Sequence, residues 1–248
     1  MELCLFSSAL PGWDAPRVAQ AALDAGLRAV EWGIGPGQAI ESPGDAAGLR
    51  DLGVAAAGIC AQGGAVSLTE PGTVRPFAAL AVELGAPHVR VFAPALEHRD
   101  LARDGFAAAA EIAHDEGVVL LVETSPGTCV PSSAQARALV EGLPPEQVGV
   151  LYDPGNMVIE GHVDPRLAVA ELGPYLRHVH VKNIAWHREQ GTWQWRHAAL
   201  DAGLLDWKAI LAALRDAKYT GKLCLDHLGG APSLETLRRE LSLLAPQP

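Results

Sequence analysis

Short apolar runs alternate with amphipathic stretches along the chain, and this alternation predicts strands and helices in turn. Gly, Pro and polar residues separate the two kinds of segment. The predicted strands cover residues 3–8, 27–34, 54–61, 88–92, 118–124, 148–153, 177–183 and 222–227. The predicted helices cover residues 16–25, 45–51, 73–84, 100–116, 132–141, 165–172, 206–217 and 233–244. Residues 186–202 fit neither pattern, and we expect them to be irregular.

Eight strands alternating with eight helices in 248 residues predict a parallel (β/α)8 barrel. A doubly wound open sheet is the alternative, but no Gly-rich phosphate fingerprint follows the first strand. The composition has no break that would mark a linker, so we expect one domain spanning residues 1–248. Active sites in such barrels lie at the carboxyl ends of the strands.

Charge and cysteine content narrow the expected partners and surroundings. The net charge of −10 is spread along the chain and argues against nucleic acid, whose phosphates need a basic face. None of the four cysteines forms a C-x-x-C pair, which favours reduced thiols in a cytoplasmic protein. The amino terminus does not read as an export signal, and no apolar run is long enough to span a membrane. The sequence leaves the oligomeric state open, and a homo-oligomer is compatible with it.

Four chemically active residues stand where predicted strands end, namely Glu123, Asp153, His180 and Asp226. If the strands form a parallel barrel, these side chains meet at one rim. Carboxylates with one imidazole are a largely oxygen-donor set, which suits one divalent cation such as Mn, Mg, Co or Zn. Each residue taken alone also has a purely structural explanation. Asp153, which precedes Pro and Gly, could simply begin a turn, and Glu123 could accept a hydrogen bond from a neighbouring amide. The prediction of a metal site therefore depends on four different strands each ending near a residue that can bind a metal.

Strand alternation also predicts which side chains point into the barrel. In the seventh predicted strand the valines alternate with His178, His180 and Lys182, so these three residues face inward. The same alternation turns Arg90 inward. We interpret Arg90 and Glu31 as a buried ion pair, and His178 as a structural core histidine.

Candidate substrate contacts lie in the loops at the same rim. Trp32 could stack on the C–H face of a sugar, although packing of the loop on itself is the more frequent use of such a ring. His197 and its neighbour Arg196 lie in the segment predicted to be irregular, where they could contact substrate or be solvated. Asn156 follows Asp153 closely and is a further candidate.

At these residues the chain resembles the sugar phosphate isomerase/epimerase family of the xylose isomerase-like barrel superfamily. The similar segments are Val-Glu-Thr-Ser-Pro-Gly-Thr (122–128), Tyr-Asp-Pro-Gly-Asn-Met (152–157), His-Val-His-Val-Lys-Asn (178–183) and Leu-Cys-Leu-Asp-His (223–227). The resemblance implies that Glu123, Asp153, His180 and Asp226 bind a divalent ion. It also implies that residues 123 and 226 exchange protons with substrate. The chain departs from the epimerases in having Asp226 instead of Glu and Asn156 instead of a substrate-binding His.

The resulting expectation is a metal-dependent isomerase or epimerase of a small sugar or sugar phosphate. Glu123 would be the principal base, its pKa raised by desolvation, and Asp226 the second proton-transfer group. Lys182 or His197 would stabilise the oxyanion. The alternatives are a metal-dependent dehydratase or lyase on a polyol or keto acid, and a sugar-binding barrel without catalysis. An abasic-site endonuclease is disfavoured, because Trp195-Arg196-His197 lacks the Asp of an Asp-x-His pair.

Overall fold

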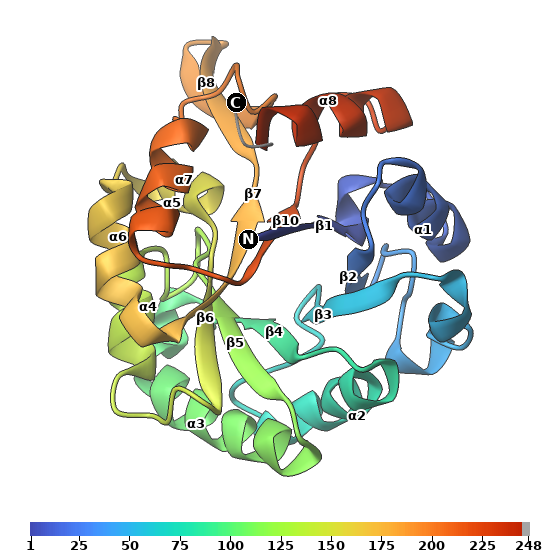
Figure 1. Ribbon diagram of the computed structural model, residues 1–248. Helices are drawn as coiled ribbons and strands as arrows, with labels where there is room; N and C mark the ends of the chain where they lie inside the picture. The colour runs from blue at the N-terminus through green and yellow to red at the C-terminus, as the bar shows by residue number, and fades with distance from the viewer. Residues whose placement is uncertain (245–248) are drawn as a thin grey trace.

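The computed structural model describes residues 1–244, and parallel strands close into a barrel at its centre (Figure 1). The barrel strands are β1 (Glu2–Phe6), β2 (Ala29–Ile34), β3 (Ala55–Ala61), β4 (His88–Phe92), β5 (Val119–Glu123), β6 (Val148–Tyr152), β7 (Leu176–Val181) and β10 (Lys222–Leu225). They follow one another around the barrel in this order, and β10 pairs with β1 to close it. The predicted (β/α)8 barrel is confirmed, and the open doubly wound sheet is excluded.

A ring of helices surrounds the barrel, as Figure 1 shows. The helices are α1 (Ala15–Asp24), α2 (Arg75–Leu84), α3 (Arg99–Glu116), α4 (Ser133–Val140), α5 (Pro154–Glu160), α6 (Pro165–Leu172), α7 (Trp207–Asp216) and α8 (Leu234–Leu244). Short 3-10 turns cover Ser7–Ala9, Pro43–Asp45, Leu49–Leu52, Pro71–Val74, Leu96–His98 and Gly173–Tyr175. Within residues 1–244, no helix has the length and hydrophobicity needed to cross a bilayer.

The helix expected over residues 45–51 is wrong. Two 3-10 turns stand there, because Gly48 adopts a left-handed backbone (φ 87°) that interrupts any continuous helix. Helix α5 was not expected, since Pro and Gly after Asp153 were interpreted as the start of a loop. Proline fits the first turn of a helix, and the Asp153 side chain caps that turn by accepting the backbone N–H of Asn156 (2.8 Å).

The segment expected to be irregular after β7 is an antiparallel hairpin. Its strands are β8 (Asn183–Glu189) and β9 (Thr192–Ala198). Gln190 and Gly191 join them, both with positive φ (47° and 84°), as in a two-residue hairpin turn. Strand prediction missed this hairpin because its two strands are largely exposed and have no buried face to produce an alternating pattern.

The barrel wall separates two environments. The large hydrophobic core lies between the outer faces of the strands and the helices. Inside the barrel a small apolar cluster is made of Cys4, Phe6, Ala29, Ala57, Cys60 and Cys224. The four cysteines are free thiols. The interior also holds charged groups, which lie at the rim and immediately beneath it.

One glycine allows a helix to approach a loop closely, and it provides a test of the packing. A Cβ on Gly105 of α3 would lie 1.9 Å from the backbone oxygen of Leu68. We expect Gly105→Ala to lower the free energy of unfolding by about 1–3 kcal/mol, although alanine is the better helix former by about 1 kcal/mol. Denaturant unfolding would measure the loss. Gly44→Ala is the control, because its nearest atom would be Ser42 Oγ at 3.7 Å. Equal effects of both substitutions would contradict this packing.

Candidate functional site

Three of the predicted rim residues converge on a single point. Glu123 ends β5, Asp153 follows β6, and His180 lies near the end of β7. One donor atom from each lies within 4.8 Å of the others, and all three side chains are buried. His180 Nδ1 is 3.6 Å from Glu123 Oε1 and 3.8 Å from Asp153 Oδ2. Convergence of the strand ends therefore produces a compact group of two carboxylates and one imidazole.

Asp226 approaches this group from β10 but is bound differently. Its Oδ1 is 3.7 Å from His180 Nδ1, whereas its Oδ2 lies 2.7 Å from Lys182 Nζ. Burial opposes ionisation of Asp226, but the Lys182 ammonium and His180 outweigh it and lower the pKa of this carboxyl. Asp226 is thus an ionised neighbour of the three-residue group rather than a member of it.

Lys182 lies between two carboxylates at the rim. Its Nζ is 2.7 Å from Asp153 Oδ2 and 2.7 Å from Asp226 Oδ2. Burial disfavours the charged amine, but the two aspartates outweigh it and raise the pKa of Lys182. Lys182 is consequently a permanent cation at neutral pH, able to donate a hydrogen bond but unable to act as a base.

Glu123 is held from two sides. Arg90 Nε lies 3.0 Å from its Oε2, and Asn156 Nδ2 donates to its Oε1 (3.0 Å). Burial alone would raise the pKa of Glu123, but Arg90 and His180 outweigh burial and lower it. Two expectations are therefore wrong: the pKa of Glu123 is lowered rather than raised, and the buried partner of Arg90 is Glu123 rather than Glu31.

Asp153 has the opposite electrostatic environment. Burial raises the pKa of Asp153 to about 7, and the charges of Asp226 and Glu123 add to this against the lowering effect of Lys182. The residue is held in place by its backbone, since its N–H donates to Thr124 Oγ1 (2.9 Å) and its Oδ1 caps α5. Asp153 is therefore fixed in position, and its pKa is shifted in the direction opposite to that of Glu123.

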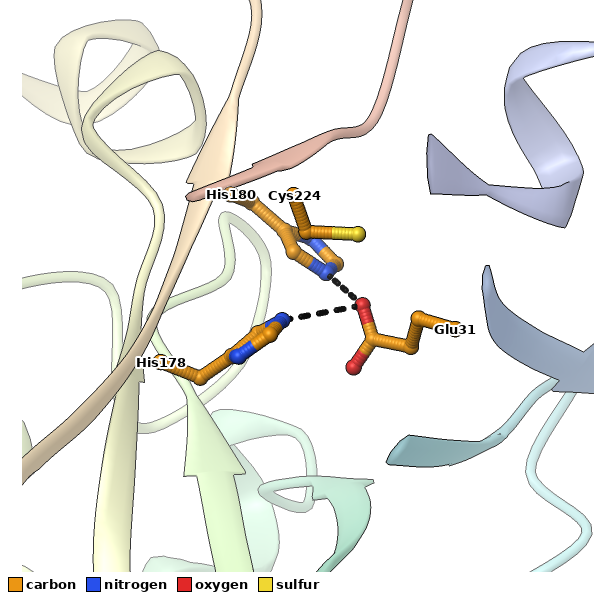
Figure 2. A group of neighbouring side chains, drawn as sticks. All are labelled: Glu31, His178, His180 and Cys224. Carbon is orange, nitrogen blue, oxygen red and sulfur yellow. Dashed lines mark hydrogen bonds and ion pairs between the residues drawn. The ribbon is translucent and has the colours of Figure 1, made fainter. Parts of the chain in front are cut away.

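Beneath the rim, Glu31 on β2 is surrounded by imidazoles (Figure 2). Its Oε2 is 2.7 Å from His180 Nε2 and 3.3 Å from His178 Nε2, and its Oε1 is 3.3 Å from His88 Nε2. Burial opposes ionisation of Glu31, but His178 and His180 outweigh it and hold its pKa well below the ordinary value. Conversely, Glu31 raises the pKa of His180 well above its ordinary value despite burial.

A cavity of about 280 Å³ opens above the rim residues. Among the predicted residues, Glu123, Asn156, Lys182, His197 and Asp226 line it. The ring of His197 stacks on that of His227 with centroids 3.6 Å apart. Burial, then His227 and Lys182, lower the pKa of His197 to about 4. The neutral imidazole therefore forms part of the cavity wall at physiological pH.

Two predicted substrate contacts do not reach this cavity. Trp32 is 1% exposed and packs in the outer core, because alternation along β2 turns it away from the side that Glu31 occupies. Arg196 is exposed on β9, where alternation places it on the face opposite His197. Neither residue lines the cavity. This cavity therefore gives no support to either assignment as a substrate-binding residue, and both stay predictions.

Several residues that line the cavity were not predicted. They are Phe6, Ser8, Gln38, Gln62, Phe92, Ser125, Pro126 and His227. Gln62 directly follows β3, so the strand-end rule that selected Glu123 would also have found it. Gln38 follows β2 and is held by a hydrogen bond with Ser8, a contact between segments that no local pattern indicates.

The geometry fits a divalent cation. His180 Nδ1 is buried and has no hydrogen-bond partner among residues 1–244, although it faces carboxylate oxygens of Glu123 and Asp153. Two buried carboxylates and one imidazole are suitable ligands for Mg, Mn, Co or Zn. A bound cation would join groups that otherwise leave this nitrogen unpaired.

Comparison with known proteins agrees with the barrel. A family model described as xylose isomerase-like TIM barrel matches residues 19–247. An inosose dehydratase from Geobacillus thermodenitrificans is 25% identical over 136 residues, which are 50% of this chain and 45% of the relative. The chain therefore spans less than half the length of this curated relative.

Solved structures with the same fold cover nearly the whole chain at low identity. A probable 3-DHS dehydratase from Bacillus anthracis has a TM-score of 0.77 at 16% identity, covering 100% of both chains. A xylose isomerase-like TIM barrel protein from Mycobacterium smegmatis, in complex with magnesium, has a TM-score of 0.74 at 17% identity. The match covers 98% of this chain and 95% of that one. A D-allulose 3-epimerase from Methylomonas sp., in complex with D-allulose, has a TM-score of 0.75 at 16% identity. The match covers 98% of this chain and 96% of that one.

The Lys182 pairs predict a large and pH-dependent effect on stability. In the presence of a chelator that removes divalent metal, we expect Lys182→Met to lower the free energy of unfolding at pH 7 by about 3–5 kcal/mol. The reason is that Asp153 and Asp226 lose the buried ammonium group that pairs with both. Lys182 lowers the pKa of both carboxyls, so without it the pKa of Asp226 rises and the pKa of Asp153, which burial already raises, rises further. The folded state then binds more protons, so the loss shrinks as the pH falls towards 5.

Urea unfolding at several pH values would measure this effect. Lys222→Met is the matched control, because Lys222 forms an exposed pair with Glu2 that is worth about 0–1 kcal/mol. The assigned pairing would be contradicted if Lys182→Met lost no more unfolding free energy than Lys222→Met, or if its loss grew as the pH fell.

Proposed function

The chain belongs to the xylose isomerase-like TIM barrel family, and from this membership we propose that it is a divalent-metal-dependent isomerase or epimerase of a sugar or sugar phosphate. The observation that carries the proposal is the convergence of Glu123, Asp153 and His180 beneath a rim cavity. The proposed reaction removes a proton from the carbon next to a carbonyl and passes through an enediolate.

Glu123, Asp153 and His180 would hold the cation, with Asp226 as a further oxygen donor. When bound, it would supply Lewis acidity that polarises the substrate carbonyl and stabilises the enediolate. This assignment is supported by His180 Nδ1, which has no hydrogen-bond partner within residues 1–244, and by the buried carboxylate oxygens that face it.

Glu123 is the best candidate for the base. It lines the cavity, and its lowered pKa keeps it ionised and ready to accept a proton at neutral pH. Arg90 and Asn156 fix the carboxylate in one orientation, which limits the reorganisation needed when the proton is transferred. The lowered pKa also makes Glu123 a weak base, so the reaction needs a stabilised enediolate.

Lys182 is suited to the opposite task. Its ammonium lines the cavity and can donate a hydrogen bond to a developing oxyanion or to an oxygen that leaves the substrate. Asp226 is engaged with Lys182, which makes it a poor second base. The pair therefore serves better as a hydrogen-bond donor to a negatively charged oxygen than as the second carboxylate of a two-base epimerase.

This pair favours a second candidate, a dehydratase. With one carboxylate and one ammonium facing the same cavity, Glu123 could remove the proton next to the carbonyl and return it to the departing hydroxyl, which leaves as water while Lys182 donates a hydrogen bond to its oxygen. The similarity to an inosose dehydratase supports this alternative. A barrel that binds sugar without catalysis is the third outcome that an experiment must separate.

Solvent exchange separates these outcomes. The purified protein would be incubated in heavy water with Mn²⁺, a panel of ketoses and ketose phosphates, and an inosose. Deuterium in the carbon position next to the carbonyl supports the isomerase or epimerase, and a product lighter by one water supports the dehydratase. A substrate that binds without either change would leave a binding protein and refute the proposed catalysis.

Substitution of the proposed base gives a sharper prediction. We expect Glu123→Gln to lower the exchange rate by at least about 100-fold, because the amide cannot accept the substrate proton. Glu111→Gln on the exposed face of α3 is the control and should retain the wild-type rate. Undiminished exchange in Glu123→Gln would eliminate Glu123 as the base.

The metal centre can be tested without substrate. We expect Asp153→Asn to weaken Mn²⁺ binding at least about 10-fold in calorimetry, whereas Asp104→Asn on α3 should not change it. Ligands must be unprotonated, and the pKa values of Asp153 and His180 are raised. The affinity of the wild-type protein should therefore fall as the pH is lowered below about 7. Affinity that is independent of pH, or of Asp153, would contradict this centre.

A further inference from the structure

We propose that Glu31 is a positioning residue: its carboxylate holds His180 by Nε2 and thereby directs Nδ1 to the metal centre. The inference rests on the proposed function, because it assigns the ligand atom of that centre. Glu31 itself does not touch the cavity. It acts from β2 at the Nε2 edge of the imidazole (Figure 2), whereas Glu123 and Asp153 lie near Nδ1.

The geometry of His180 carries the inference. Glu31 Oε2 lies 2.7 Å from His180 Nε2, which is the shortest polar contact of this ring. The other ring nitrogen, Nδ1, points to the rim and lies 3.6 Å from Glu123 Oε1 and 3.8 Å from Asp153 Oδ2. An ionised carboxylate only accepts hydrogen bonds, so Nε2 must carry the hydrogen. The lone pair available to a cation is then on Nδ1.

Glu31 is itself rigidly held, which a positioning residue requires. His178 Nε2 lies 3.3 Å from the same oxygen, and His88 Nε2 lies 3.3 Å from the other. His88 occupies room that only a glycine leaves, because a Cβ on Gly58 would lie 2.2 Å from His88 Nε2. All these side chains are buried, so water does not compete for the carboxylate.

The same atoms allow a rival arrangement. Glu31, His178, His180 and Cys224, which Figure 2 draws, each offer a donor atom. These atoms lie within 4.8 Å of one another. A cation placed there would use His180 Nε2 and the Cys224 thiolate, and the rim residues would not be its ligands. The short contact between Glu31 and His180 favours a hydrogen bond, because 2.7 Å is ordinary hydrogen-bond length.

The experiment compares Mn²⁺ and Co²⁺ binding in wild-type, Glu31→Gln, Glu31→Asp and Cys224→Ala proteins. Calorimetry gives Kd, and circular dichroism verifies the fold. Outer carboxylate partners of metal-binding histidines contribute about 10–100-fold in affinity, and we expect Glu31→Gln to lose this much. Glu31→Asp should lie between it and the wild type. Cys224→Ala should bind as the wild type does, with no thiolate charge-transfer band in the Co²⁺ spectrum.

Nitrogen NMR of the wild-type protein loaded with Mg²⁺ provides a readout that a purely structural role would not change. We expect the hydrogen of His180 on Nε2, and this result does not depend on any variant folding. Hydrogen on Nδ1, or unchanged Kd in a folded Glu31→Gln protein, would overturn the inference. Weakened binding in Cys224→Ala together with a thiolate band would overturn it in favour of the rival arrangement. A wild-type protein that binds no divalent cation would refute the metal centre, and this inference with it.

Discussion

The arrangement of the rim depends on the mutual neutralisation of charges inside a barrel that excludes water. Ionised groups buried at this depth are stable only when each has a close partner of opposite charge. The carboxylates and their nitrogen partners are Glu31 with His88, His178 and His180, Glu123 with Arg90, and Asp153 and Asp226 with Lys182. These pairs join strands that are distant in sequence, so the charge network fixes the relative positions of the chemical groups.

The network also divides the tasks among similar side chains. Glu123 and Asp226 both line the cavity, yet one is bound by a guanidinium and an amide while the other is bound by an ammonium. Aspartate is one methylene shorter than glutamate, and at position 226 its carboxylate lies beside Lys182. The rim consequently presents one carboxylate and one ammonium to a ligand, which is an asymmetric arrangement. Such asymmetry suits a reaction in which the carboxylate takes a proton and the ammonium stabilises negative charge that develops on an oxygen.

The sequence predicted the barrel and the convergence at its rim, because both follow from local patterns. Strand ends identify Glu123, Asp153 and Asp226, and alternation along β7 places His180 and Lys182 inside. Pairing within the interior could not be predicted in this way. Which carboxylate Arg90 reaches depends on strand tilt and side-chain length, and neither is visible in a local pattern. The same lack of a local signal concealed the hairpin that places His197 on the cavity wall.

His180 links the two levels of the interior because an imidazole has two nitrogens on opposite edges. One edge faces Glu31 in the middle of the barrel, and the other faces the carboxylates at the rim. A change in the carboxylate below therefore alters the donor strength and direction of the nitrogen above, without contact with any ligand in the cavity. Glu31 is in turn held by His88 and His178, which line a second cavity at the opposite end of the barrel. The donor strength of His180 at the rim therefore depends also on residues at that opposite end.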